Sequence, residues 1–109
     1  MSKLSTAYDC TLVYFDKHHN EKGNISVVQN MKDIPFEVRR VYYLYDVPGG
    51  ESRGGHAHYE LKQLLVAVSG SFDVVIDDGN VKRTFTLNRP YQGLLVTPGL
   101  WRELNNFSS

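Results

Sequence analysis

Two histidines, His56 and His58, stand two residues apart in a glycine-rich stretch of the chain. On a β-strand, side chains two positions apart project from the same face, so the two imidazoles would lie side by side. Adjacent imidazoles serve either as metal ligands or as a pair that transfers protons near neutral pH. An exposed strand with two polar residues and no chemistry is the plain alternative, and the pair alone does not decide among these possibilities.

The histidine pair belongs to a longer pattern of fixed spacings. Gly50 comes before it, Gln63 follows it, and Gly70 closes the pattern. Glycines at such positions allow the positive φ that tight turns need. The pattern resembles the first motif of the cupin superfamily, G-x5-H-x-H-x4-E-x6-G. That resemblance implies a jelly-roll barrel and says much less about function.

Two positions depart from the metal-binding cupins. Gln63 stands where the motif has its acidic ligand, and Arg102 stands where a third histidine would follow the turn at Pro98. An arginine side chain stays protonated and has no free lone pair, so it cannot ligate a metal ion. We therefore predict a site with no metal and no other cofactor, in which His56 and His58 are available for proton transfer.

Short β-type runs make up the chain that must position these residues. Its 109 residues suffice for one domain, 1–109, with a single core. Turn residues separate the runs, and no window of about a dozen residues shows a helical period. The pattern predicts an all-β, antiparallel fold with at most one helical turn, within Met31–Phe36. The expected strands are Thr11–Phe15, Asn24–Gln29, Arg39–Tyr45, Leu61–Val68, Ser71–Ile76, Val81–Leu87, Gly93–Thr97 and Trp101–Leu104.

Polar residues mark the connections between these runs. Asp77–Asn80 is a strong hairpin signal, and Ser69-Gly70 separates two apolar runs as a tight turn would. The stretch 17–23 is polar and is expected to be a solvated loop, so its two histidines are not expected to be ligands. On the expected strand Arg39–Tyr45, each face carries a cation, an aliphatic residue and a phenol, so the pattern does not decide which face points inward.

Charge and composition exclude several classes of protein. Twelve Lys and Arg balance twelve Asp and Glu, so the chain lacks the basic excess of a nonspecific nucleic-acid binder. No apolar run approaches the roughly 20 residues that cross a bilayer, and the start of the chain has no signal-peptide core. The lone Cys10 excludes an internal disulfide. We expect a soluble cytoplasmic protein without nucleic-acid or membrane partners.

Over nearly its whole length the sequence resembles a narrower family, the sugar 3,4-ketoisomerases of the cupin superfamily. The resemblance runs from about Asn24 to Ser109 and is carried by an ordered set of motifs: Ile34-Pro35-Phe36, Arg40-Val41-Tyr42-Tyr43, Arg53-Gly54-Gly55-His56-Ala57-His58, Leu61, Gln63, Asp77-Asp78-Gly79, Pro98 with Trp101, and Asn106-Phe107-Ser108-Ser109. Such a resemblance implies a small jelly-roll homodimer that needs no metal. It also implies that the ketone of a thymidine-diphosphate (TDP) 4-keto-6-deoxyhexose moves from C4 to C3, in the synthesis of bacterial deoxysugars and surface glycans.

The resemblance makes His56 and His58 the proton-handling residues, and the chemistry agrees. A 4-ketone acidifies the hydrogen on C3, a base removes that proton to give an enediol, and reprotonation at C4 leaves the ketone at C3. We assign His56 as the acid and base at carbon and His58 as its partner, with the order of the two roles left open.

Cations and phenols are expected to bind the rest of the substrate. Arg102, Tyr42 or Arg53 would stabilise the enolate charge. Arg40, Arg53 and Lys22 are candidates for the diphosphate, and a tyrosine for stacking on thymine. Lys22 and Arg102 occupy positions where family members differ, so they are expected to face the substrate and to select the face of C4 that is protonated. The predicted substrate-binding residues are Lys22, Arg40, Tyr42, Arg53, Gln63 and Arg102.

Members of the family continue beyond position 109 into another strand and a helix, so the chain is expected to be truncated at its C-terminus. Such a truncation would leave one sheet edge open. In one interpretation a partner chain pairs with this edge, for example by strand exchange within the homodimer. One alternative is a truncated, non-catalytic cupin that binds a nucleotide sugar or a partner. Another is a metal-dependent cupin enzyme, and a more distant one is a 3,5-epimerase-like activity.

Overall fold

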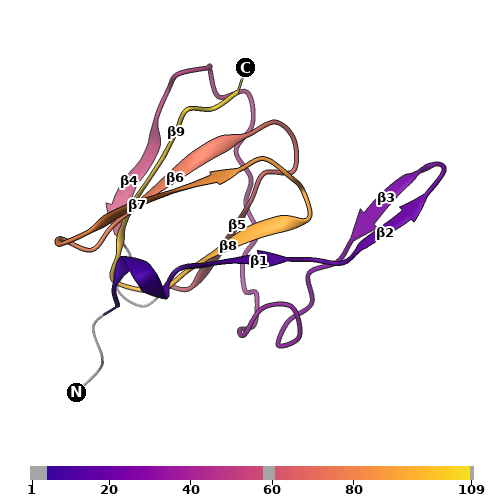
Figure 1. Cartoon of the computed structure of the whole chain (residues 1–109), viewed down its shortest axis with the longest axis horizontal. Helices are drawn as coiled ribbons and strands as arrows, with labels where there is room; N and C mark the ends of the chain where they lie inside the picture. Colours follow the sequence, from indigo (N-terminus) through magenta and orange to yellow (C-terminus); the bar gives the residue numbers. More distant parts are fainter. Residues whose placement is uncertain (1–4, 58–60, 109) are drawn as a thin grey trace.

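The computed structural model describes residues 5–57 and 61–108, which form a short 3₁₀-helix and nine β-strands (Figure 1). Every strand pair among these residues is antiparallel, so the predicted all-β, antiparallel class is confirmed. No helix in this part of the chain has the length and apolarity of a membrane span. The elements are η1 (Ala7–Asp9), β1 (Thr11–Tyr14), β2 (Lys17–Asn20), β3 (Gly23–Ser26), β4 (Arg53–Ala57), β5 (Gln63–Val66), β6 (Phe72–Asp77), β7 (Lys82–Leu87), β8 (Gln92–Val96) and β9 (Trp101–Asn105).

Two sheets share one core, and a separate hairpin extends from them. The smaller sheet has the order β1-β8-β5, the larger has the order β4-β9-β6-β7, and β2 pairs only with β3. Buried positions alternate along β6 and β7, whereas β5 and β8 carry continuous apolar runs that are at least half-buried throughout. The buried core consists of Ala7, Cys10, Ala67, Val74, Ile76, Phe85, Leu87, Leu94, Val96 and Leu100.

Close packing at Gly93 brings β5 against β8. A Cβ atom at this position would lie 2.7 Å from the Cδ1 atom of Leu64 and 3.1 Å from the Cζ atom of Phe15. A side chain there would displace Leu64 and press on the Phe15 ring, so glycine favours this close approach of β5 and β8.

The hairpin predicted at Asp77–Asn80 is present and joins β6 to β7. The Asp78 carboxylate accepts hydrogen bonds from the backbone N–H groups of Ala7 at 2.8 Å and Val81 at 2.7 Å. These bonds, that from Ala7 first, hold the pKa of Asp78 below its usual value. One side chain thus shapes the turn and fastens η1 to it.

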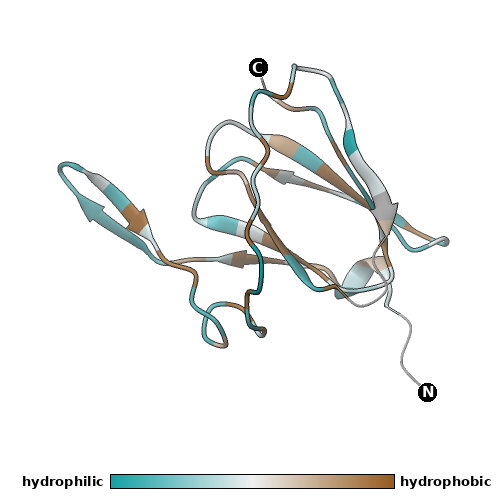
Figure 2. Ribbon diagram, turned by 180° about the vertical axis from the view of Figure 1, so that it is seen from behind, coloured by the Kyte–Doolittle hydropathy of each residue, from teal (hydrophilic) through white to brown (hydrophobic). Residues whose placement is uncertain are grey.

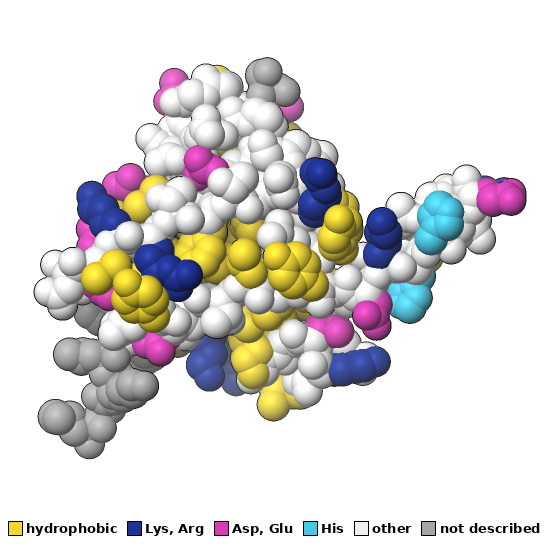
Figure 3. Space-filling view, in the orientation of Figure 1, with side chains coloured by type: hydrophobic (Ala, Val, Ile, Leu, Met, Phe, Trp, Pro, Cys, Tyr) yellow, Lys and Arg dark blue, Asp and Glu magenta, His cyan; other side chains and the backbone are white. Residues whose placement is uncertain are grey.

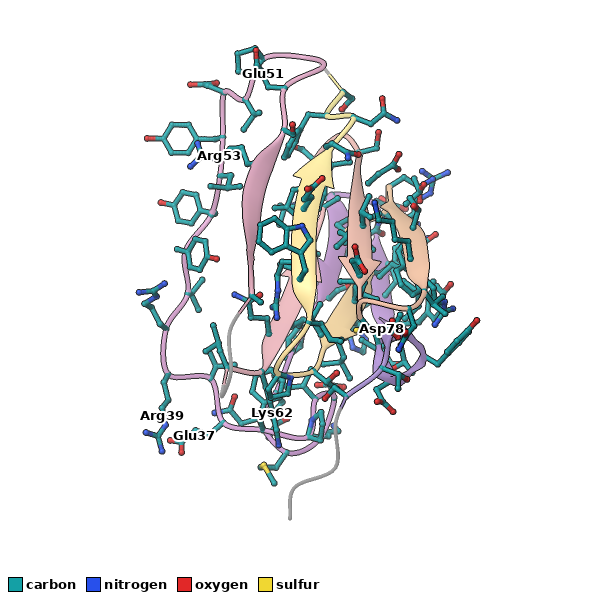
Figure 4. The ribbon with its side chains drawn as sticks, turned by 90° about the vertical axis from the view of Figure 1, so that its left-hand side faces the viewer. Glu37, Arg39, Glu51, Arg53, Lys62 and Asp78 are labelled. Atoms are coloured by element: carbon teal, nitrogen blue, oxygen red, sulfur yellow. The ribbon has the colours of Figure 1, made fainter. Side chains whose placement is uncertain are left out.

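Arg39–Tyr45 is not a strand, which corrects the sequence prediction. Its backbone is extended but has no ladder partner among the described residues, and it runs alongside β4 from Arg39 towards Glu51 (Figure 4). Val41 and Tyr43 are each 78% exposed. Two of its residues, Tyr42 and Leu44, line a pocket together with residues of the edge strands β4 and β5.

The stretch 17–23 is not a loop, contrary to the prediction. Its first four residues form β2, which pairs with β3, and the β3 strand ends at Ser26 instead of Gln29. Gly23 has a φ of 131°, which side-chain-bearing residues rarely adopt, and this allows the turn. The hairpin projects from the main body (Figure 1), and all of its residues are exposed. Because no part of the hairpin packs on a core, its strands are polar, and this composition is also typical of loops.

Three shorter features complete the comparison with the sequence prediction. The turn predicted at Ser69-Gly70 is present, with Gly70 at a φ of 66°, and it leads from β5 in one sheet to β6 in the other. Met31–Phe36 holds turns and a bridge from Asn30 to Ile34, which agrees with the expectation of at most one helical turn there. A strand at Arg53–Ala57, absent from the predicted set, is present as β4.

Candidate active site

A pocket opens between β4 and β5, the edge strands of the two sheets. It holds about 450 Å³ of empty space, part of it open to solvent. Segment 42–44 forms one wall, and β9 contributes two side chains. The lining residues are Tyr42, Leu44, Arg53, Gly54, Gln63, Leu65, Arg102 and Leu104. Four of the six predicted substrate-binding residues therefore meet here.

Arg102 is the buried cation of this pocket. It lies on β9 and is only 2% exposed. Its Nη1 atom donates to the Oε1 atom of Gln63, and its Nη2 atom donates to the carbonyl of Leu100 at 3.3 Å. Its Nε atom is buried without a partner among the described residues. Burial lowers the pKa of Arg102, and both acceptors of its guanidinium are neutral oxygens.

Gln63 links Arg102 to the extended segment. Its Nε2 atom donates to the hydroxyl of Tyr42 at 3.5 Å, while its Oε1 atom accepts from Arg102. Tyr42 is about half exposed. A polar chain thus runs from the solvent-facing segment through β5 to the buried guanidinium on β9.

Arg53 and Arg40 differ in their relation to the pocket. Arg53 extends from β4 towards the extended segment (Figure 4) and lines a neighbouring second pocket that also includes Tyr45 and Glu51. The guanidinium of Arg40 lies over the ring of Tyr42, 5.0 Å from its centroid. Arg40 is exposed and does not line the main pocket.

The two histidines are placed only in part. His56 belongs to β4, where the strand register pairs it with Arg102 on β9. The pocket-lining residue Gly54 is two positions away on the same strand. The side chain of His56 and the whole of His58 lie outside the described part of the structure, so their roles, and the prediction of a site without metal, stay predictions.

Lys22 does not reach the pocket within one chain. It lies in the turn between β2 and β3, where its backbone N–H donates to the Oδ1 atom of Asn20 at 2.9 Å. The hairpin that carries it points away from the two sheets, and the histidine side chains visible in Figure 3 lie on this hairpin. Lys22 therefore cannot contact a substrate in the pocket of its own chain, and the predicted contact would need the pocket of a second chain.

Apolar pocket residues were missed by the sequence analysis. Leu44, Leu65 and Leu104 each lie two positions after a predicted polar residue, namely Tyr42, Gln63 and Arg102. A period of two puts such pairs on one face of an extended chain. Applying that period to each predicted residue would have identified these walls.

Comparisons with known proteins agree on one family. Residues 8–109 match a protein-family model described as "FdtA: WxcM-like, C-terminal". The chain is 43% identical over 98 residues to the TDP-4-oxo-6-deoxy-alpha-D-glucose-3,4-oxoisomerase of Aneurinibacillus thermoaerophilus, covering 90% of this chain and 70% of that protein.

Solved structures give the same result. A 3,4-ketoisomerase from Helicobacter canadensis is 41% identical with a TM-score of 0.89, covering 92% of this chain and 75% of that one. QdtA, a sugar 3,4-ketoisomerase from Thermoanaerobacterium thermosaccharolyticum solved in complex with TDP, is 31% identical with a TM-score of 0.90, covering 94% and 75%. The chain belongs to the FdtA family, and these three relatives are sugar 3,4-ketoisomerases, as its motifs predicted.

Proposed function

We propose that this chain is an isomerase that moves the keto group of TDP-4-keto-6-deoxyglucose, or a closely similar TDP-hexose, from C4 to C3. The observation that carries the proposal is the 43% identity to an enzyme named for that conversion. The pocket supports it, because Tyr42, Arg53, Gln63 and Arg102 line it with hydrogen-bond donors, and the strand register pairs Arg102 with position 56. A cytoplasmic location stays a prediction from the sequence.

The reaction balances within the sugar itself. A histidine takes the proton from C3, and the electrons of that C–H bond form a double bond between C3 and C4. Negative charge then develops on the oxygen at C4, and a buried guanidinium such as that of Arg102 stabilises it. When the oxygen at C4 and C4 itself each take up a proton and the C3 hydroxyl loses one, C4 is reduced and C3 is oxidised. No external oxidant or reductant is needed.

Hydrogen exchange tests this proposal directly. In deuterated water with TDP-4-keto-6-deoxyglucose, we expect the C3 hydrogen signal to disappear and a 3-keto product to appear in proton NMR spectra. The same rate should persist after dialysis against a chelator. Absence of exchange above the enzyme-free background would contradict the proposal. TDP binding without exchange would favour the non-catalytic alternative, and loss of exchange on chelation would favour the metal-dependent one.

We also propose a homodimer in which the β2–β3 hairpin packs on a second copy of the chain. An isolated two-stranded hairpin is marginally stable in water, and this one has no core of its own. Ile25 is 66% exposed and Val27 is 52% exposed, and the hydrophobic stretch near the base of the hairpin is visible in Figure 2. A hairpin seated on the partner would also carry Lys22 away from its own body, which is consistent with its predicted role at a substrate.

Ile25→Asp tests the dimer, because a carboxylate there would be desolvated in the contact. We expect the dissociation constant of the dimer, measured by sedimentation velocity, to rise about tenfold or more. Met31→Asp is the matched control, since Met31 is 73% exposed outside the hairpin, and it should leave association unchanged. A monomeric wild-type protein would contradict the homodimer, and equal association by the wild type and both variants would contradict the hairpin contact.

A further inference from the structure

Gln63 has an unusual neighbour for a neutral side chain. It accepts a hydrogen bond from Arg102, a guanidinium that is 2% exposed. Buried arginines are normally paired with carboxylates, because an uncompensated charge is costly to remove from water. Among the described residues, the acceptors of this guanidinium are an amide oxygen and the backbone carbonyl of Leu100. The site holds the cation firmly without neutralising it.

The orientation of the Gln63 amide is fixed from the other side. An amide has one acceptor oxygen and one donor nitrogen. The nitrogen of Gln63 donates to the hydroxyl of Tyr42, 3.5 Å away, which turns the oxygen towards Arg102. A glutamate at this position has nearly the same shape, but it would place a full negative charge against the guanidinium and compete with any anionic ligand for it.

We infer that Gln63 is a positioning residue, which aligns Arg102 through a neutral amide so that its positive charge stays available to an anionic oxygen of the bound sugar nucleotide. The inference rests on the proposed function, in which such an oxygen develops at C4 of the sugar. Arg102 acts on the reacting atoms, and Gln63 acts only through Arg102. Desolvation of the guanidinium, which lowers its pKa, makes its charge all the more responsive to a new counter-ion.

Gln63→Glu tests the inference, because it changes charge with little change of shape. We expect kcat for isomerisation of TDP-4-keto-6-deoxyglucose to fall by about tenfold or more, since the charge that stabilises the developing oxyanion is neutralised. KM should stay within about threefold, because the loss is felt mainly in the transition state. The melting temperature should stay level or rise, because a buried cation gains its counter-ion. A chelator is present throughout, since the new carboxylate lies near the histidine strand.

Gln92→Glu is the matched control. Gln92 is also a buried glutamine, 8% exposed on β8, and it also donates to a tyrosine hydroxyl, that of Tyr14 at 3.2 Å. Among the described residues its side chain bonds to no guanidinium, and it does not line the pocket. Its variant should therefore melt at a lower temperature while keeping the wild-type kcat below that temperature.

Two outcomes would overturn the inference. Wild-type kcat in Gln63→Glu would show that the charge of Arg102 is not needed. A fall in melting temperature as large as that of Gln92→Glu would show that Gln63 serves packing alone. The melting measurement does not depend on activity, so it judges Gln63 even if the wild-type protein shows no isomerisation, which would instead defeat the proposed function.

Discussion

His56→Asn is expected to lower hydrogen exchange at C3 of TDP-4-keto-6-deoxyglucose by on the order of 10²–10⁴-fold, the usual contribution of a general acid or base. Asparagine has a similar size but does not titrate, so it cannot take up the carbon-bound proton. The register of β4 with β9 pairs position 56 with Arg102, so the proposed base and the guanidinium proposed to stabilise the oxyanion belong to one strand pair. The exchange rate is measured by proton NMR in deuterated water.

Binding separates a chemical loss from a folding loss in this variant. Its affinity for TDP, measured by calorimetry, should stay close to that of the wild type, because an imidazole that moves protons contributes little to holding the diphosphate. Exchange within about threefold of the wild-type rate would contradict the assignment. His58→Asn then tells the two roles apart. If His58 is the partner of the carbon base, its loss should slow product formation more than hydrogen exchange at C3.

Arg102→Met is expected to reduce kcat by about 10²-fold or more, because in the proposed reaction it removes the positive charge that stabilises the developing oxyanion. The melting temperature of this variant should not fall together with its kcat. The guanidinium is 2% exposed and its described acceptors are neutral, so replacing it by an apolar side chain of similar length removes a desolvation cost. We therefore expect an unchanged or higher melting temperature together with a slow enzyme.

Arg83→Met is the control for that experiment. Arg83 lies on β7, where its guanidinium is 4.6 Å from the ring centroid of Phe85 and 5.1 Å from that of Tyr8. It does not line the pocket, so its loss should leave kcat unchanged. If Arg102→Met kept most of its activity, or lost activity only in proportion to a fall in stability, Arg102 would not be the residue that stabilises the oxyanion.

Local patterns predicted the strands whose partners are close in the sequence or whose burial is strong. The hairpin of β6 and β7 was predicted from its turn residues, and β8 from its apolar run. The prediction of a strand at Arg39–Tyr45 was wrong. Its composition favours a strand, but a strand also needs a neighbouring backbone to pair with, and this segment has none among the described residues. The prediction of a loop at 17–23 was wrong for the opposite reason, because its polar residues form a strand pair across a glycine turn without any core.

The candidate site was predictable where motif spacing fixed it. Tyr42, Arg53, Gln63 and Arg102 come from four separate parts of the chain, yet the structure brings them to one pocket. Arg40 and Lys22 were selected by their charge alone. Which way Arg40 faces depends on how its segment lies against the barrel, and the reach of Lys22 depends on the direction of a hairpin. Neither of these tertiary features can be predicted from the local sequence.

The unpaired wall formed by Arg39–Tyr45 has a consequence for how this enzyme family diversifies. Alternate residues of the wall, Tyr42 and Leu44, line the pocket, yet no sheet in the described part of the chain includes the backbone that carries them. Substitutions there can reshape the room for a sugar without disturbing a ladder, and even a change in segment length would leave both sheets intact. Natural variation in substrate choice should therefore accumulate along this rim faster than in the strands that face it.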